Sequence, residues 1–209
     1  MEVLAAVANH VGFALAIGGA VVRTAFCDVA PAACRRGVAW TMLTGALLVG
    51  AGGMAEVWAV VDWITFGRVD ANAFVGYLRE TRHGMTVALR FVGAVFAALV
   101  ATRFPCPPRR TSAPLTVAGV AWLATAAVVG HTGSMGVPYA VVSLAHLAAM
   151  ATWIGSLATL AGTMNWSDAG AIQAAFRRLG RIGVVAVAVL GATGFAMARL
   201  HLQGPDSWA

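Results

Sequence analysis

Residues 131–155, HTGSMGVPYAVVSLAHLAAMATWIG, place histidines and methionines in a stretch that contains no charged side chain. Imidazole nitrogens and thioether sulfurs are ligands that suit soft Cu(I), whereas Mg²⁺, Ca²⁺ and Mn²⁺ prefer carboxylates and water. Similar residues recur in other apolar segments of the chain. The candidate metal ligands are His10, His131, His146, Met54, Met135 and Met150. A neutral set of this kind predicts copper binding, and binding of Cu(I) in particular.

The elements that carry these residues are predicted to be membrane helices. Of the 209 residues, 60% are hydrophobic and 11% are charged, whereas soluble globular domains are about 25% charged. This composition excludes an ordinary water-soluble domain. All 14 positive residues are arginines, and most lie between apolar runs. Membrane orientation explains that pattern better than nucleic-acid binding does.

Six apolar runs are long enough to cross the hydrocarbon core of a bilayer, which takes about 20 helical residues. They are predicted at 3–22, 38–60, 85–103, 114–131, 138–163 and 181–201. Together they indicate an all-α integral membrane protein, a six-helix transmembrane bundle that forms a single domain over residues 1–209. Arginines concentrate in the first, third and fifth connecting segments, which the positive-inside rule places in the cytoplasm, with both termini outside.

On this topology the three histidines His10, His131 and His146 fall on separate spans in the outer half of the bundle. His10 and His146 lie roughly 10 Å below the outer face, because an α-helix rises about 1.5 Å per residue. Met54 lies at a similar depth in the second span. Polar residues inside a membrane usually face the bundle interior and carry a function, so this arrangement favours a shared site.

Ordinary structural roles remain open for individual members of the set. A methionine in a membrane helix usually fills a packing gap, and a lone histidine can hydrogen-bond to a neighbouring helix. His83, in the second connecting segment, and His201, near the end of the last span, are expected to be solvated, with a role as entry ligands for the metal as the alternative. Arg90, inside the third span, can extend to the interface, pair with Glu56, or contact a lipid or cofactor.

The three cysteines fall in the first and third connecting segments, which are predicted to be cytoplasmic. They are Cys27, Cys34 and Cys106. A reducing compartment makes disulfides unexpected there. The cysteines are either unremarkable thiols or soft ligands on the exit side of a path that begins at the histidines and methionines.

A weak internal repeat relates the first two spans to the last two. The fragment NHVGFALAIGGA around His10 is similar to AHLAAMATWIGS around His146, and a glycine follows each histidine at the same spacing. The next helix carries Thr-Gly in both halves, at Thr44-Gly45 and at Thr193-Gly194.

These segments resemble the copper-resistance D (CopD) family of bacterial inner-membrane proteins. The resemblance is carried by Gly130-His131, by His146 with Trp153-Ile154-Gly155, by Arg177-Arg178 and by Thr193-Gly194. In the first half, His10, Thr44-Gly45 and the TRHG stretch also match, the last where the family usually has Thr-x-Tyr-Gly. Family members usually continue for two further helices after the Thr-Gly helix, and this chain lacks them.

The resemblance implies copper uptake across the bacterial cytoplasmic membrane, often beside a periplasmic copper-binding C-type partner. Carried over residue by residue, it assigns His10, His131 and His146 to the metal, while the methionines come from the depth argument alone. A transporter or copper-binding protein is expected rather than an enzyme; no hydrolase, kinase or nucleotide-binding motif occurs, so energy coupling would come from the ion gradient or from thiol capture inside. Its other expected partners are the lipid bilayer and further copies of the chain.

Two other functions stay open on the sequence. In a membrane b-type cytochrome, His10 and His146 would hold a haem iron between facing helices. An accessory subunit of a larger membrane complex is the third possibility. The absorption spectrum of the purified protein separates the first two, because haem b gives an intense Soret band and Cu(I) gives none.

Overall fold

The computed structural model describes residues 2–26, 32–103, 109–128, 136–164 and 168–202, with side chains for 3–26, 35–103, 118–127, 136–164 and 168–200. The helices are α1 (Glu2–Ala25), α2 (Ala32–Ile64), α3 (Ala71–Glu80), α4 (Arg82–Arg103), α5 (Arg109–Val128), α7 (Val137–Thr163) and α8 (Ala169–Leu202). These ranges contain helices and no strand, so the prediction of an all-α fold is confirmed.

Five helices are long and apolar enough to cross a membrane, which makes this a multi-pass membrane protein by the length and composition of its helices. They are the helices over Val3–Ala25, Arg35–Ile64, Arg82–Arg103, Val137–Thr163 and Ala169–Leu200. The predicted fourth span, 114–131, falls on α5. The part of α5 with described side chains, Ala118–Ala127, is shorter than a membrane crossing requires. A total of six spans therefore stays a prediction.

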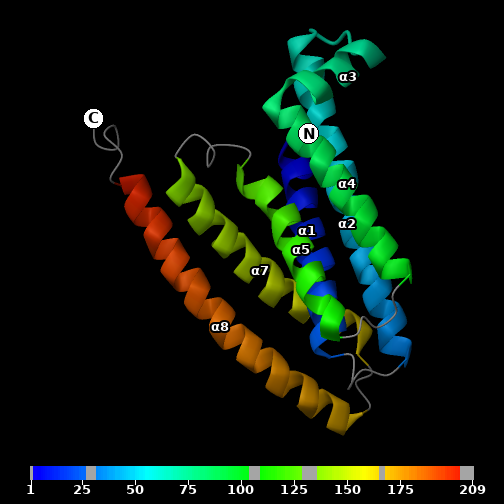
Figure 1. The fold of residues 1–209 in the computed structure, drawn as a ribbon, viewed down its shortest axis with the longest axis vertical. Helices are drawn as coiled ribbons and strands as arrows, with labels where there is room; N and C mark the ends of the chain where they lie inside the picture. The colour runs from blue at the N-terminus through cyan, green and yellow to red at the C-terminus, as the bar shows by residue number, and fades with distance from the viewer. Residues whose placement is uncertain (1, 27–31, 104–108, 129–135, 165–167, 203–209) are drawn as a thin grey trace.

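The long helices run alternately up and down the bundle, so that α1 begins and α8 ends at the same end of it (Figure 1). Helix α1 is central and packs against both α2 and α7. Helix α4 lies against α2, α5 lies against α7, and α8 forms the edge of the bundle beside α7.

Small residues bring α1 into backbone contact with two neighbours. Gly18 of α1 faces Gly155 of α7 so closely that a Cβ on Gly18 would overlap the Gly155 backbone, and a Cβ on Gly155 would overlap the Ala14 carbonyl of α1. A Cβ on Gly45 of α2 would lie 2.6 Å from the Gly12 carbonyl oxygen and 2.5 Å from the Ala16 nitrogen. At these positions the abundant glycines serve close helix packing, as small residues commonly do in membrane bundles.

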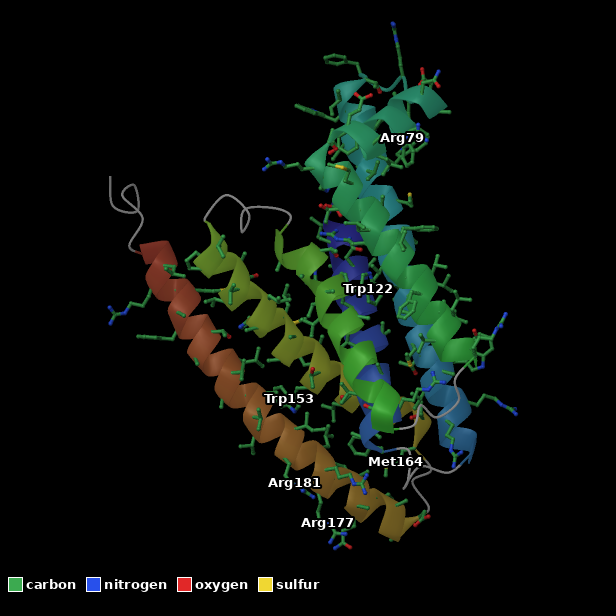
Figure 2. The ribbon with its side chains drawn as sticks, viewed as in Figure 1. Arg79, Trp122, Trp153, Met164, Arg177 and Arg181 are labelled. Carbon is green, nitrogen blue, oxygen red and sulfur yellow. The ribbon has the colours of Figure 1, made fainter. Side chains whose placement is uncertain are left out.

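Two helices extend beyond their predicted spans, α2 beyond 38–60 and α8 beyond 181–201. Asp168 caps α8, because its Oδ1 accepts a hydrogen bond from the Ala171 backbone nitrogen at 2.9 Å. Arg177, predicted to lie in a loop, is part of the lower end of this helix (Figure 2). Hydrophobicity indicates the part of a helix that lies in lipid, whereas a cap indicates the residue at which the helix begins. The predicted spans were based on hydrophobicity alone, so they are shorter than the helices.

The second connecting segment, predicted as a loop, contains helix α3. Asp70 caps α3 by accepting a hydrogen bond from the Ala73 nitrogen at 2.7 Å. Thr81 ends α3 and caps α4, since its hydroxyl oxygen accepts a hydrogen bond from the Gly84 nitrogen at 2.8 Å. Helix α4 therefore begins before its predicted start at 85, and it includes His83.

Candidate functional site

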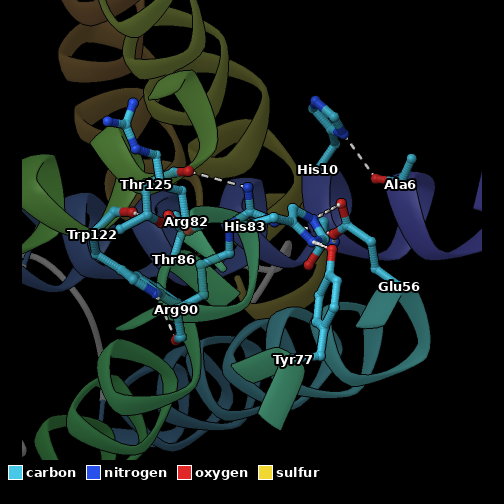
Figure 3. Close-up of polar contacts among 11 residues, drawn as sticks. Ala6, His10, Glu56, Tyr77, Arg82, His83, Thr86, Arg90, Trp122 and Thr125 are labelled. Carbon is cyan, nitrogen blue, oxygen red and sulfur yellow. Dashed lines mark hydrogen bonds and ion pairs between the residues drawn. The ribbon is translucent and has the colours of Figure 1, made fainter. Parts of the chain in front are cut away.

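Glu56 of α2 lies at the centre of a group of polar side chains from several helices (Figure 3). Its carboxylate accepts hydrogen bonds from His83 Nε2 at 2.9 Å, from Arg90 Nη1 at 3.2 Å and from Asn9 Nδ2 at 3.3 Å. The Tyr77 hydroxyl lies 2.8 Å from the second ring nitrogen of His83, Nδ1. We call these five residues, Asn9, Glu56, Tyr77, His83 and Arg90, the Glu56 cluster.

The positions of the protons in the cluster follow from its partners. A carboxylate can only accept, so His83 Nε2 donates to Glu56. Burial raises the pKa of the Tyr77 phenol above its usual range, and the Glu56 charge raises it further, so the hydroxyl stays protonated. This hydroxyl lies against His83 Nδ1. Both ring nitrogens are thus engaged by protein groups, and His83 offers no free lone pair to a metal.

Arg90 is buried, with 5% of its side chain exposed, and is paired with Glu56, of which 29% is exposed. Its Nη2 donates to the Thr125 carbonyl at 3.1 Å. That carbonyl belongs to the last turn of α5, where the helix itself supplies no donor. The Trp122 indole donates to the Arg90 carbonyl at 2.9 Å. Of the three roles open to Arg90 on the sequence, pairing with Glu56 is confirmed.

The TRHG stretch positions Tyr77 against His83. Thr81 turns the chain between α3 and α4, and Gly84 lets the two helices close, because a Cβ there would overlap the Tyr77 carbonyl. The tyrosine and histidine rings meet edge-on with their centroids 5.8 Å apart. The prediction that His83 is solvated is therefore wrong: it is half-buried, and it is held by two helices other than its own.

His10 points away from Glu56, although its neighbour Asn9 belongs to the cluster (Figure 3). Consecutive residues of an α-helix are turned by about 100° from each other, so the two side chains serve different faces of α1. His10 Nδ1 lies 2.7 Å from the Ala6 carbonyl oxygen. A carbonyl only accepts, so Nδ1 carries the proton and Nε2 carries the lone pair.

His146 of α7 reaches the same protonation state through a different partner. Its Nδ1 lies 3.0 Å from the hydroxyl oxygen of Thr193 on α8. That hydroxyl donates its one proton within its own helix, to the Val189 carbonyl at 2.6 Å. Thr193 therefore accepts from His146 Nδ1–H, and Nε2 again carries the lone pair.

The structure describes the remaining predicted ligands only in part. Met54 and Met150 are half-buried, and no hydrogen bond or ring contact joins them to His10 or His146 in the described chain. Four predicted residues lie outside the described residues: His131, Met135, Cys27 and Cys106. The side chains of Cys34 and His201 do so too. Within the described ranges, no three His, Cys, Asp or Glu side chains form a group that could hold a metal ion.

Asn9 as a partner of Glu56 and Tyr77 as a partner of His83 were not predicted from the sequence. The only available signal was the presence of Glu56 and Arg90 inside apolar helices, where isolated charges are costly. Asn9 directly precedes the candidate ligand His10 in the chain, and Tyr77 lies in a segment predicted as a loop. Thr193 was noted as part of a repeat but not as a partner of His146.

Comparison with known proteins finds no relative: no protein-family model, no curated protein and no solved structure matches this chain. The resemblance to the CopD family therefore remains a hypothesis. Function has to be argued from the side chains and their hydrogen bonds.

Proposed function

We propose that this chain is a bacterial inner-membrane copper protein that binds Cu(I) from the outer side and passes it toward the cytoplasm. The observation that carries the proposal is the hydrogen bonding of His10 and His146. Nδ1 of each ring lies against an oxygen atom of the protein, which leaves Nε2 as the nitrogen for a metal. Metal-binding histidines almost always have their other ring nitrogen held in this way.

The Glu56 cluster supports the choice of metal. The Glu56 carboxylate already accepts three hydrogen bonds, and both ring nitrogens of His83 are engaged. The Glu56 carboxylate, a hard ligand, is thus occupied by protein donors. What remains for a metal are neutral imidazole nitrogens and thioether sulfurs, which suit a soft monovalent ion.

In the complete proposal, His10, His131 and His146 form the principal site, with Met54, Met135 and Met150 as thioether ligands. The cysteines Cys27, Cys34 and Cys106 would receive copper on the cytoplasmic side, where thiolates bind soft metals. A periplasmic copper-binding protein would supply the ion. Copper is here the cargo, and the chain's own task is to bind and release it.

Competitive Cu(I) titration of the purified protein tests the proposal. His10→Ala and His146→Ala should each lower the Cu(I) affinity about tenfold or more, equivalent to about 1.4 kcal/mol. His83→Ala is the matched control and should leave the affinity unchanged, because that ring has no free lone pair. Equal effects of all three changes would contradict the assignment, as would zinc binding as tight as Cu(I) binding. A Soret band in the purified protein would favour the haem alternative instead.

A further inference from the structure

A second buried arginine, Arg23, has no counter-charge in the described part of the chain. Only 6% of it is exposed, although it lies in the last turn of α1. Its Nη1 donates to the Ala101 carbonyl at 3.2 Å and lies 3.7 Å from the Met42 sulfur. Its Nη2 is buried and has no hydrogen-bond partner there. Unlike Arg90, which pairs with Glu56, Arg23 is a buried cation that needs an anion.

Arg23 lines a cavity of about 180 Å³ between α1, α2, α4, α5 and α7. The wall consists largely of small or apolar residues, among them Ala20, Gly93, Ala97 and Gly119. Thr24 also lines it, but its hydroxyl is bonded to carbonyls of its own helix. An apolar cavity of about 150 Å³ in another protein binds benzene, so this space admits a ring or a segment of an acyl chain.

We propose that this cavity binds an anionic phospholipid, with the phosphate on the Arg23 guanidinium and part of one acyl chain in the cavity. The unpartnered Nη2 supplies a charge-assisted hydrogen bond to a phosphate oxygen. The apolar wall matches an acyl chain. Arg23 lies in the last turn of α1, at the depth where a membrane helix meets lipid headgroups, so the adjacent leaflet supplies the ligand directly.

Net negative charge should decide which lipid binds. A zwitterionic headgroup carries its own cation beside the phosphate, so it neutralises Arg23 less well than a headgroup with net negative charge. The exposed Arg103, which ends α4, does not line the cavity. We therefore expect phosphatidylglycerol to bind in preference to phosphatidylcholine.

Two substitutions remove the two halves of the site. Arg23→Gln removes the charge while keeping a polar side chain of similar length. Gly119→Leu fills the cavity, because a Cβ at this position meets no atom within 4 Å. The matched controls are Arg103→Gln, an exposed arginine, and Gly191→Leu on α8, where a Cβ also meets no atom within 4 Å but which does not line the cavity.

Native mass spectrometry of the full chain in detergent measures the bound lipid, with phosphatidylglycerol, phosphatidylcholine and inorganic phosphate added in separate samples. The parent and both controls should retain one phosphatidylglycerol, and Arg23→Gln and Gly119→Leu should each lower its affinity about tenfold or more. Circular dichroism checks that the variants fold. If Arg23→Gln does not fold, Gly119→Leu decides the matter alone.

Three results would overturn the proposal. Retention unchanged in Gly119→Leu would show that the lipid binds elsewhere. Equal affinity for phosphatidylcholine would remove the role of Arg23 as a counter-charge. The third result is that inorganic phosphate prevents lipid binding in the parent and in Gly119→Leu alike. This would show that the arginine holds a free anion and that the cavity takes no acyl chain.

Discussion

Glu56 accepts hydrogen bonds from three side chains on two neighbouring helices, α1 and α4, and its negative charge makes the buried Arg90 tolerable in an apolar bundle. An ion pair of this kind adds little stability compared with apolar packing, but the loss of one partner leaves the other charge buried and alone. The network also removes His83 from the set of available metal ligands. The Glu56 carboxylate therefore keeps His83 in a network that holds the helices together. His10 and His146 lie outside this network and can bind an ion.

The first prediction at this scale concerns stability. Glu56→Gln keeps the shape of the side chain but leaves Arg90 without a counter-charge, so the free energy of unfolding should fall by about 2–4 kcal/mol. Asp62→Asn, an exposed change in the same helix, should have little effect. Thermal unfolding in detergent measures both. A Glu56→Gln protein as stable as the parent would mean that water or another group already neutralises Arg90.

The second prediction concerns the tautomer of His146. Thr193→Val deletes the oxygen that accepts from Nδ1–H, so the ring loses the partner that keeps its lone pair on Nε2. Loss of such a supporting partner typically costs 10- to 100-fold in metal affinity, and we expect about tenfold for Cu(I). Thr102→Val is the control, because that exposed hydroxyl bonds only to carbonyls of its own helix. Equal Cu(I) affinity in the parent and Thr193→Val would show that Thr193 does not orient the ligand.

At the scale of helices, the two Thr-Gly pairs that define the repeat have different surroundings. Gly45 lies against the backbone of α1, where there is no room for a side chain. A Cβ on Gly194 would meet no atom within 4 Å. In the second pair the threonine, Thr193, makes the contact, a hydrogen bond with His146. In the first pair the glycine, Gly45, makes the contact, with the backbone of α1. Similar sequence therefore does not mean similar packing here.

This difference predicts opposite effects of the same substitution. Gly45→Ala should destabilise the protein by about 1–3 kcal/mol, because α1 and α2 must move apart. Gly194→Ala should be neutral or stabilising by up to about 1 kcal/mol, because alanine favours a helix more than glycine does. Unfolding of the two variants in parallel measures the effect. Equal destabilisation by both would mean that α8 packs on a surface at Gly194 that the described residues do not contain.

For the molecule as a whole, the direction of the helices determines which ends face the same side of a membrane. Helix α1 begins and α8 ends at one end of the bundle, and Arg177 and Arg181 lie toward the other end (Figures 1 and 2). This arrangement is what six crossings would produce. Which of the two ends faces the cytoplasm stays a prediction from the positive-inside rule.

The topology prediction follows directly. A reporter that is active only in the cytoplasm should be silent when it is fused after Ala209, and a reporter active only outside should give signal there. The same pair of reporters inserted between α1 and α2 should give the reverse result. Cytoplasmic activity at Ala209 would place the cysteines on the wrong side for an exit site and would contradict the orientation.

Local features of the sequence were enough to predict the helices, because both hydrophobicity and caps act over a few residues. Long apolar runs predicted five described membrane helices, and Asp70 and Asp168 were present in the sequence as caps even though the prediction did not use them. The pairing of Arg90 with Glu56 was one of three stated possibilities, since two charges in apolar helices at similar depth have few other partners.

Tertiary structure alone decided which face of each helix meets which neighbour. Asn9 and His10 are adjacent in the chain, yet one binds Glu56 and the other does not, because the rotation of α1 against α2 assigns them to different faces. The Nδ1 partner of His146 is Thr193 on α8, which the ring reaches only in the folded bundle, whereas the Nδ1 partner of His10 is a carbonyl of its own helix. Arg23 and Arg90 are both arginines in apolar helices, and only the packing of the bundle gives one a carboxylate and the other a cavity. These distinctions depend on contacts between segments far apart in the chain, which neither composition nor local spacing encodes.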